Sequence, residues 1–430
     1  MLKAGFSRLD VTPPLGSFIS GYFIKRYAKG VLEPILLNAL ALSDGNTTSI
    51  IIAADLLGIR KNYCDEILSL ISERTKVPTD NITICCLHQH TSIALRDTAN
   101  NNVMKDKCYL EYLYRKFIDA SVMAINDLTE AKISTAEAET SEKISFIRRY
   151  IMKDGRVETN PHGKKDKILK PYYDADNTVR LIRFKRHGAR DIALVNFSTH
   201  ADVVHGEYFS SDWPGFTRSF VENDLENVSC IMTVGCEGDS NHADFTLDEY
   251  RDGYEHSRHM GRVIADAVVG MWDNTEDDTP TDILCRKDIL FNKTRTDGEE
   301  SYEECVKLLA DPNNNTADGS KIELLGNASR IVGLRNQPIY QKLPMSSICF
   351  GRIGIIGFGG EPFTRYAVRI RKKLPDKFII TLVCANGMEG YLPIKEAFRE
   401  GGYEAGASPF SPSLEDDCTK VAVKLLNKNG

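Results

Sequence analysis

Two histidines separated by one residue follow a short apolar run. His88 and His90 come directly after residues 82–87, a run that is typical of a buried strand. In an extended chain alternate side chains point to the same side, so both imidazole rings can reach one site. Such a pair can supply two metal ligands, or one ligand and a general base. Two surface histidines that follow a strand by chance are the alternative interpretation.

A third histidine stands in the same kind of position, and a glycine-rich loop follows the next strand. His200 comes after the apolar run of residues 193–198, and Asp239 and Ser240 lie in the loop of residues 235–242. Active sites of α/β sheets collect at the carboxyl ends of strands, which would bring these groups to one edge. The loop contains neither GxxxxGK[ST] nor GxGxxG, the usual phosphate-binding patterns. A plain turn is the alternative.

Two further strand ends present a carboxylate and a phenol. Glu361 follows two glycines and begins a predicted helix, and Tyr391 follows a predicted strand over residues 377–385. Glutamate is favoured by the helix dipole in a first turn, so Glu361 can also be a plain helix-start residue. Tyr391 can likewise be an ordinary turn residue. Taken with the histidines, these groups match the three or four N and O ligands that zinc accepts.

The elements that must position these groups alternate along the chain. The expected strands are residues 36–42, 48–57, 82–87, 178–186, 191–198, 228–234, 348–357 and 377–385, and the expected helices are residues 61–74, 106–128, 212–225, 248–271 and 363–374. This alternation predicts an α/β core of mixed sheet with helices outside. Residues from about 297 to 344 are polar and predict a mostly helical excursion over the core.

Composition excludes several functional classes. The chain has 430 residues, 42% of them hydrophobic and 27% charged, which is ordinary for a globular enzyme. A formal net charge of -6 offers no general attraction to nucleic acid. No run approaches the roughly 18 apolar residues of a membrane span, and the N-terminus has no signal-peptide core. Eleven scattered cysteines without CxxC spacing predict free thiols, and a cytoplasmic location is therefore expected.

The order of short motifs resembles the neutral (non-lysosomal) ceramidase family, zinc amidases that cleave the N-acyl bond of ceramide. The resembling segments extend over almost the whole chain: residues 4–14 (AGFSRLDVTPP), 54–57 (ADLL), 88–90 (HQH, against the family's His-Thr-His), 198–200 (STH), 210–212 (SSD), 238–240 (GDS), 360–361 (GE) and 386–407. The resemblance implies stacked mixed β-sheets flanked by helices, in a single large catalytic domain over residues 1–430. The immunoglobulin-like domain expected at the C-terminus of secreted members has no counterpart.

The resemblance also implies roles for individual residues. One Zn²⁺ per chain is expected, and its implied ligands are His88, His200, Glu361 and Tyr391. His90 is implied to act as general base, and Tyr403 to stabilise the oxyanion. Arg149 resembles a substrate-binding arginine, although Arg148 fits almost as well.

Departures from the family pattern keep alternatives open. The family's Ser-Gly-Pro-Gly-Gly is replaced by residues 91–95 (TSIAL), and its Gly-Asp-Val-Ser-Pro-Asn is shortened to residues 238–241 (GDSN). Asp239 and Ser240 therefore stay candidates for catalysis, with Ser240 as a second-ranked nucleophile.

The expected reaction is hydrolysis of an N-acyl amide by metal-activated water, on a small or lipid-like acyl substrate. The alternatives are a hydrolase of a small soluble ester, lactone or N-acyl compound, and a non-catalytic binding protein that uses the same cleft.

Overall fold

A large mixed sheet forms the centre of the molecule, for which a computed structural model describes residues 1–97, 101–248, 250–278, 282–314, 321–335 and 337–427. Its strands lie in the order β18 (Val228–Val234), β16 (Asp191–Phe197), β15 (Thr178–Arg186), β10 (Thr129–Glu139), β1 (Lys3–Asp10), β5 (Leu36–Ser43), β6 (Thr48–Ala54) and β8 (Ile82–Cys86), and β20 (Glu276–Asp278) pairs with β10. The pairs β16/β18 and β6/β8 are parallel, and the other pairs are antiparallel. The predicted mixed sheet is confirmed.

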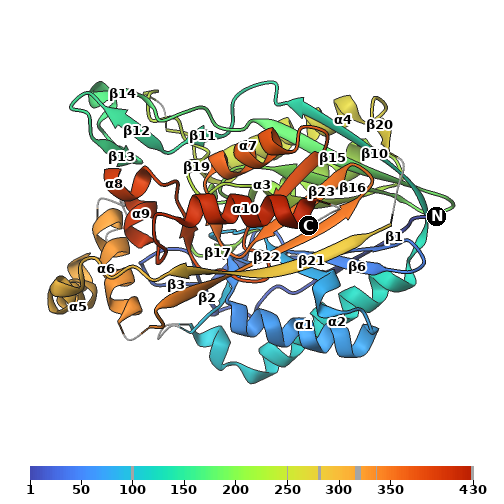
Figure 1. Ribbon diagram of the computed structural model, residues 1–430, viewed down its shortest axis with the longest axis horizontal. Helices are drawn as coiled ribbons and strands as arrows, with labels where there is room; N and C mark the ends of the chain where they lie inside the picture. The colour runs from blue at the N-terminus through green and yellow to red at the C-terminus, as the bar shows by residue number, and fades with distance from the viewer. Residues whose placement is uncertain (98–100, 249, 279–281, 315–320, 336, 428–430) are drawn as a thin grey trace.

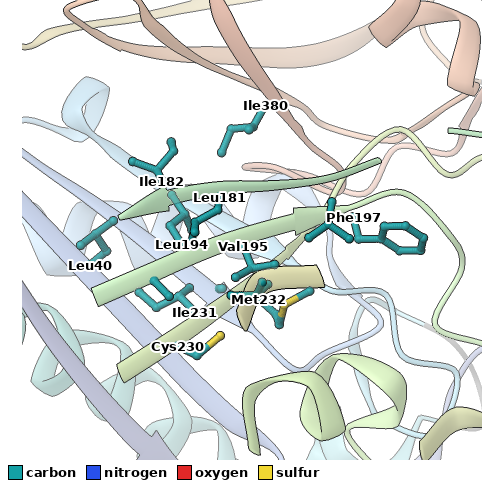
Figure 2. Close-up of a cluster of buried hydrophobic side chains, with 14 of the residues drawn as sticks. Leu40, Leu181, Ile182, Leu194, Val195, Phe197, Cys230, Ile231, Met232 and Ile380 are labelled. Atoms are coloured by element: carbon teal, nitrogen blue, oxygen red, sulfur yellow. The ribbon is translucent and has the colours of Figure 1, made fainter. Parts of the chain in front are cut away.

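A second, smaller sheet stacks on the first. It consists of β21 (Leu284–Lys293), β22 (Tyr340–Phe350), β23 (Ile353–Phe358) and β25 (Phe378–Leu382). One apolar core contains side chains of both sheets, and Figure 2 shows Ile182 of β15 on the side of its strand that faces Ile380 of β25. β8, β18 and β25 are buried along their whole length, because elements cover both of their faces.

Helices cover the outer faces of both sheets (Figure 1). α2 (Lys107–Asn126) packs on β1 and β5, and α1 (Lys61–Thr75) packs beside it; Asp106 caps α2 by accepting a hydrogen bond from the Tyr109 amide. The large sheet also contacts α3 (Asp212–Asp224) and α4 (Gly253–Met271), whereas α10 (Leu414–Leu426) covers the small sheet and contacts α7 (Thr364–Lys373). Within the described residues, no helix has the length and apolar character of a membrane span.

Two predicted elements are wrong in their bounds, and the strands expected over residues 48–57 and 377–385 end earlier, at Ala54 and Leu382. Residues 348–357 are not one strand, because Gly351 has a φ of 58° and turns the chain between antiparallel strands β22 and β23. The apolar alternation on both sides of this turn hides it in the sequence. The helix expected from residue 248 begins only at Gly253, because Asp252 is still extended, with a φ of -151°.

The polar region over residues 297–344 leaves the small sheet and returns to it. α5 (Tyr302–Ala310) and α6 (Ile322–Leu334) lie between β21 and β22, which pair along their whole length. Residues 315–320 and 336 of this range lie outside the described residues, and β22 already begins at Tyr340. α6 packs against α9 (Tyr403–Ala407), so this region contacts the segment that contains Tyr403.

Candidate metal centre

Chain segments that follow several strands bring polar side chains to one place. β8 leads to His88, β16 leads to His200 and β18 leads to Glu237. One ligand atom from each of these residues and from Glu361 lies within 4.8 Å of the others. Glu361 follows β23, and its backbone pairs with that of Tyr391 between the short strands β24 (Glu361–Pro362) and β26 (Tyr391–Leu392).

The backbone around His88 is held in an unusual conformation. His88 has a φ of 63°, and Cys384 and Asn386 also have left-handed values of 45° and 56°. The Asn386 side chain accepts a hydrogen bond from the Ile84 amide at 2.9 Å, which ties this segment to β8. Non-glycine residues in this region are strained by about 1–3 kcal/mol and cluster at functional sites. Nδ1 of His88 lies 2.8 Å from the Leu57 carbonyl oxygen, so an Nδ1–H would leave Nε2 as a ligand.

His200 is oriented in the same way. Its Nδ1 lies 2.9 Å from the carbonyl oxygen of Glu237 and 3.0 Å from that of Ser240. An Nδ1–H donated to these carbonyls fixes the ring and leaves Nε2 unprotonated. Nε2 of His200 is buried and has no hydrogen-bond partner among the described residues.

The four buried groups fit a divalent cation. Oε2 of Glu361 lies 3.3 Å from Nε2 of His88 and 3.6 Å from Nε2 of His200, but it makes no hydrogen bond within the described part of the chain. Both carboxylate oxygens of Glu237 are buried and also lack partners there. Buried polar atoms are normally hydrogen-bonded or bind metal. Inward-facing nitrogen and oxygen atoms without partners are what a metal site requires.

The electrostatics of the cluster point the same way. Burial, together with the Glu361 carboxylate, raises the pKa of Glu237 well above its usual range. Burial alone would raise the pKa of Glu361, but His88 and His200 hold it well below its usual range. Burial opposes a charge on His88, yet Glu361 raises the pKa of this imidazole to about 9. A dication would remove this conflict, because it favours the ionised carboxylates and the neutral imidazoles together.

Glu237 is a member of the cluster that the sequence did not single out. It lies in the glycine-rich loop after β18, where attention fell on the neighbouring Asp239 and Ser240. The available signal was its place directly after a buried strand, since that is also the place of His88 and His200.

The His90 ring lies beside the rings of His88 and His200. One ligand atom of His90 lies within 4.8 Å of those of His88 and His200, so three histidines are a second possible metal-binding group. Both ring nitrogens of His90 lack hydrogen-bond partners among the described residues, and Nδ1 lies 3.5 Å from Oδ1 of Asp202. Burial lowers the pKa of His90 to about 3, so its ring is uncharged at neutral pH. Asp202 was also missed, although it follows His200 by only two residues.

The predicted tyrosines lie together beside His200. The Tyr391 ring stacks on the His200 ring with centroids 6.4 Å apart, and the Tyr403 centroid is 5.5 Å from that of Tyr391. The guanidinium of Arg148 lies 5.4 Å from the Tyr391 ring and 6.0 Å from the Tyr403 ring. Burial and the Glu361 charge raise the pKa of Tyr403 to about 12, so its hydroxyl keeps its proton.

The two adjacent arginines face different partners. Arg149 is fully buried, and its guanidinium donates to the Gly401 carbonyl at 2.8 Å and lies 3.6 Å from Glu404. Arg148 also binds Glu404, at 2.7 Å, but it additionally contacts Tyr391. Of the two candidates for substrate binding, Arg148 is therefore the one that faces the tyrosines.

The side chains of Asp239 and Ser240 are engaged in hydrogen bonds with neighbouring protein groups. Oδ1 of Asp239 accepts hydrogen bonds from the amide and hydroxyl of Thr364 at 2.7 and 2.9 Å, at the start of α7. The Tyr173 hydroxyl donates to the other carboxylate oxygen. The Ser240 hydroxyl is buried and donates to the Glu237 carbonyl at 3.3 Å. These contacts hold the loop against α7 and His200.

Gly238 allows this loop to approach Glu361. A Cβ at residue 238 would lie 2.3 Å from the Glu361 carbonyl oxygen. We expect Gly238→Ala to push the loop away from β24, to lower the free energy of unfolding by about 1–3 kcal/mol, and to reduce the bound metal. Gly270→Ala is the control, since no atom lies within 4 Å of its added Cβ. Urea unfolding and metal content would measure both effects, and equal results for the two variants would contradict this account.

A buried ion pair supports the loop that contains His88 and His90. Arg218 of α3 donates to both oxygens of Asp55 at 2.9 and 2.6 Å, and Gln89 donates to Asp55 at 3.3 Å. We expect Arg218→Ala to lower the free energy of unfolding by about 3–5 kcal/mol, because it leaves a buried unpaired charge. Arg156→Ala, which breaks an exposed contact with Asp154, should leave stability unchanged in the same urea titration. A small effect of Arg218→Ala would show that the pair does not support the loop.

Two solved ceramidase structures have a similar fold. The neutral ceramidase from Pseudomonas aeruginosa aligns with a TM-score of 0.75 over 99% of this chain and 74% of that chain, at 13% sequence identity. A ceramidase complexed with C2 aligns with a TM-score of 0.73, with the same coverage and identity. No protein-family model matches the sequence, and no curated protein matches it significantly. The likeness therefore establishes the fold: stacked mixed sheets with flanking helices, as in the ceramidases.

Proposed function

We propose that this chain is a metal-dependent hydrolase that cleaves an N-acyl amide bond. The observation that carries the proposal is the buried group of His88, His200, Glu237 and Glu361, in which one or more ligand atoms of His200, Glu237 and Glu361 have no hydrogen-bond partner within the described residues. The fold that the chain shares with ceramidases supports the reaction class.

Zinc is the proposed ion, because imidazole and carboxylate groups are among its preferred ligands. His88, His200 and Glu361 are the proposed ligands, and Tyr391 is the fourth ligand that the resemblance implies. The chemistry supplied by such an ion is polarisation of a carbonyl and activation of water at neutral pH.

His90 is the proposed general base. Its ring lies beside both histidine ligands, and both of its nitrogens lack hydrogen-bond partners among the described residues, so one of them is free to accept the proton of the attacking water. The same ring would then donate a proton to the leaving amine. Asp202, 3.5 Å from Nδ1, would hold the ring in position.

Tyr403 and Arg148 are proposed to stabilise the negative charge that develops on the carbonyl oxygen. The Tyr403 hydroxyl keeps its proton, and Arg148 lies close to both tyrosine rings. A single donor of this kind contributes roughly 2.7–4 kcal/mol to transition-state stabilisation in other enzymes. The hydrogen bond of the Ser240 hydroxyl to the Glu237 carbonyl favours water over Ser240 as nucleophile.

A second candidate substrate class is a small polar N-acyl compound, ester or lactone. The observation that favours it is the cluster of polar side chains near His90, where the Tyr22 hydroxyl donates to Asp202 and lies 2.8 Å from Nδ1 of His205. Such groups suit a substrate with hydrogen-bonding groups better than an alkyl chain.

Parallel hydrolysis assays would test the proposal. Zinc-loaded protein would be supplied with detergent-dispersed ceramide, water-soluble N-acyl amino acids and simple lactones, and amine or acid release would be measured. Turnover of any N-acyl amide that is lost in Glu361→Gln supports the proposed reaction. Turnover of lactones or esters alone would move the second class to first place, and zinc binding without any turnover would favour a binding protein.

A further inference from the structure

We propose that Glu237 is a ligand of the metal and takes the place expected for the phenol of Tyr391. The proposal rests on the proposed metal site, but it does not depend on which bond the enzyme cleaves. It gives the centre two imidazole nitrogens and two carboxylate groups from His88, His200, Glu237 and Glu361.

The geometry around Glu237 carries the proposal. Its side chain is fully buried, and a carboxylate oxygen lies within 4.8 Å of the ligand atoms of His88, His200 and Glu361. Neither carboxylate oxygen has a hydrogen-bond partner within the described part of the chain. A carboxylate is rarely buried without a cation or a set of donors. The same residue accepts a hydrogen bond from Nδ1 of His200 through its carbonyl, so its backbone orients one ligand while its side chain faces the centre.

The Tyr391 ring contacts the side chains of His200, Arg148 and Tyr403. Its ring stacks on the His200 ring, and the Arg148 guanidinium lies 5.4 Å from its ring centroid. Tyr403 also lies against it, with ring centroids 5.5 Å apart. The Tyr391 ring is therefore packed against three other side chains, whereas the Glu237 carboxylate oxygens have no hydrogen-bond partner among the described residues. These ring contacts suit Tyr391 to the positioning of Arg148 and Tyr403.

Charge balance favours the same assignment. Two carboxylates and a dication sum to zero, which lowers the cost of burying the ion away from water. Without the metal, Glu237 and Glu361 lie close together in a buried place, and burial of an unpaired carboxylate is unfavourable. The apo protein should therefore tolerate Glu237→Gln, which has nearly the same shape and no charge.

Cobalt substitution can test the assignment without any substrate. Visible absorption of Co²⁺-loaded protein reports the ligand set, and competition with a chelator gives the Co²⁺ and Zn²⁺ dissociation constants. Wild type would be compared with Glu237→Gln and Tyr391→Phe. We expect Glu237→Gln to weaken Co²⁺ binding by about 10-fold or more and to alter the absorption bands. Tyr391→Phe should keep the wild-type bands and bind within a few-fold of wild type.

Each other outcome is informative. Unchanged bands in Glu237→Gln, or altered bands in Tyr391→Phe, would overturn the assignment and leave the proposed hydrolase intact. Wild-type protein that binds neither Co²⁺ nor Zn²⁺ would overturn the metal site itself, and the proposed function with it. Thermal melts of the apo proteins control for folding, and Glu237→Asp, which keeps the charge but shortens the side chain, provides a second variant that should also alter the bands.

Discussion

Replacing His88 by alanine is expected to remove the bound metal and abolish measurable hydrolysis. His88 is buried with its Nε2 3.3 Å from Oε2 of Glu361, and its Nδ1 lies 2.8 Å from the Leu57 carbonyl oxygen, so the variant loses a ligand that the backbone orients. Zinc sites with three or four ligands lose most of their affinity when one imidazole is removed. Plasma mass spectrometry should find about one zinc per wild-type chain and close to none in His88→Ala.

A second histidine variant serves as the control, because it shows whether loss of any histidine lowers the metal content. His187 is exposed, in the turn between β15 and β16, and His187→Ala should keep both metal and activity. If His88→Ala retained as much zinc as His187→Ala, His88 would not be a ligand.

Replacing His90 by alanine is expected to lower kcat by about 10²–10⁴-fold, the usual range for loss of a general base. The metal should stay, because His88, His200 and the two carboxylates are untouched. KM should change little, since the ring acts on the proton rather than on substrate binding. Steady-state kinetics and metal content on the same sample would show both parts of the result.

Turnover within a few-fold of wild type would show that His90 is not the base. Loss of zinc in His90→Ala would instead favour the three-histidine group, in which His90 is a ligand. Asp202→Asn is a useful companion variant, because it should lower kcat less than His90→Ala while keeping the metal.

The sequence predicted the elements best where burial makes the pattern simple. The apolar runs that became β5, β8 and β18 are buried along almost all of their length, so composition alone identified them. The two-residue turn at Gly351 was missed because apolar residues continue on both sides of it. The predicted start of α4 lies five residues before Gly253, because the polar residues that precede the helix contain no clear boundary signal.

Only part of the candidate site could be predicted from the sequence, because some of its residues meet through long-range packing. His88, His200 and Glu361 could be named because each follows a strand and bears a side chain typical of metal sites, and the structure brings their ligand atoms together. Glu237 and Asp202 depend on long-range packing: the loop after β18 folds onto β24 through Gly238, and Asp202 meets His90 from a distant strand end. Distances of this kind are set by the stacking of strands and loops, which a local pattern does not encode.

The measurement that tests the central claim most directly is anomalous diffraction at the zinc absorption edge, from crystals of protein prepared with zinc and without chelators. The account predicts one peak at about 2.0–2.2 Å from Nε2 of His88, Nε2 of His200 and a carboxylate oxygen of Glu361. No peak at that position, or peaks only at surface side chains, would contradict the metal centre and the hydrolase built on it.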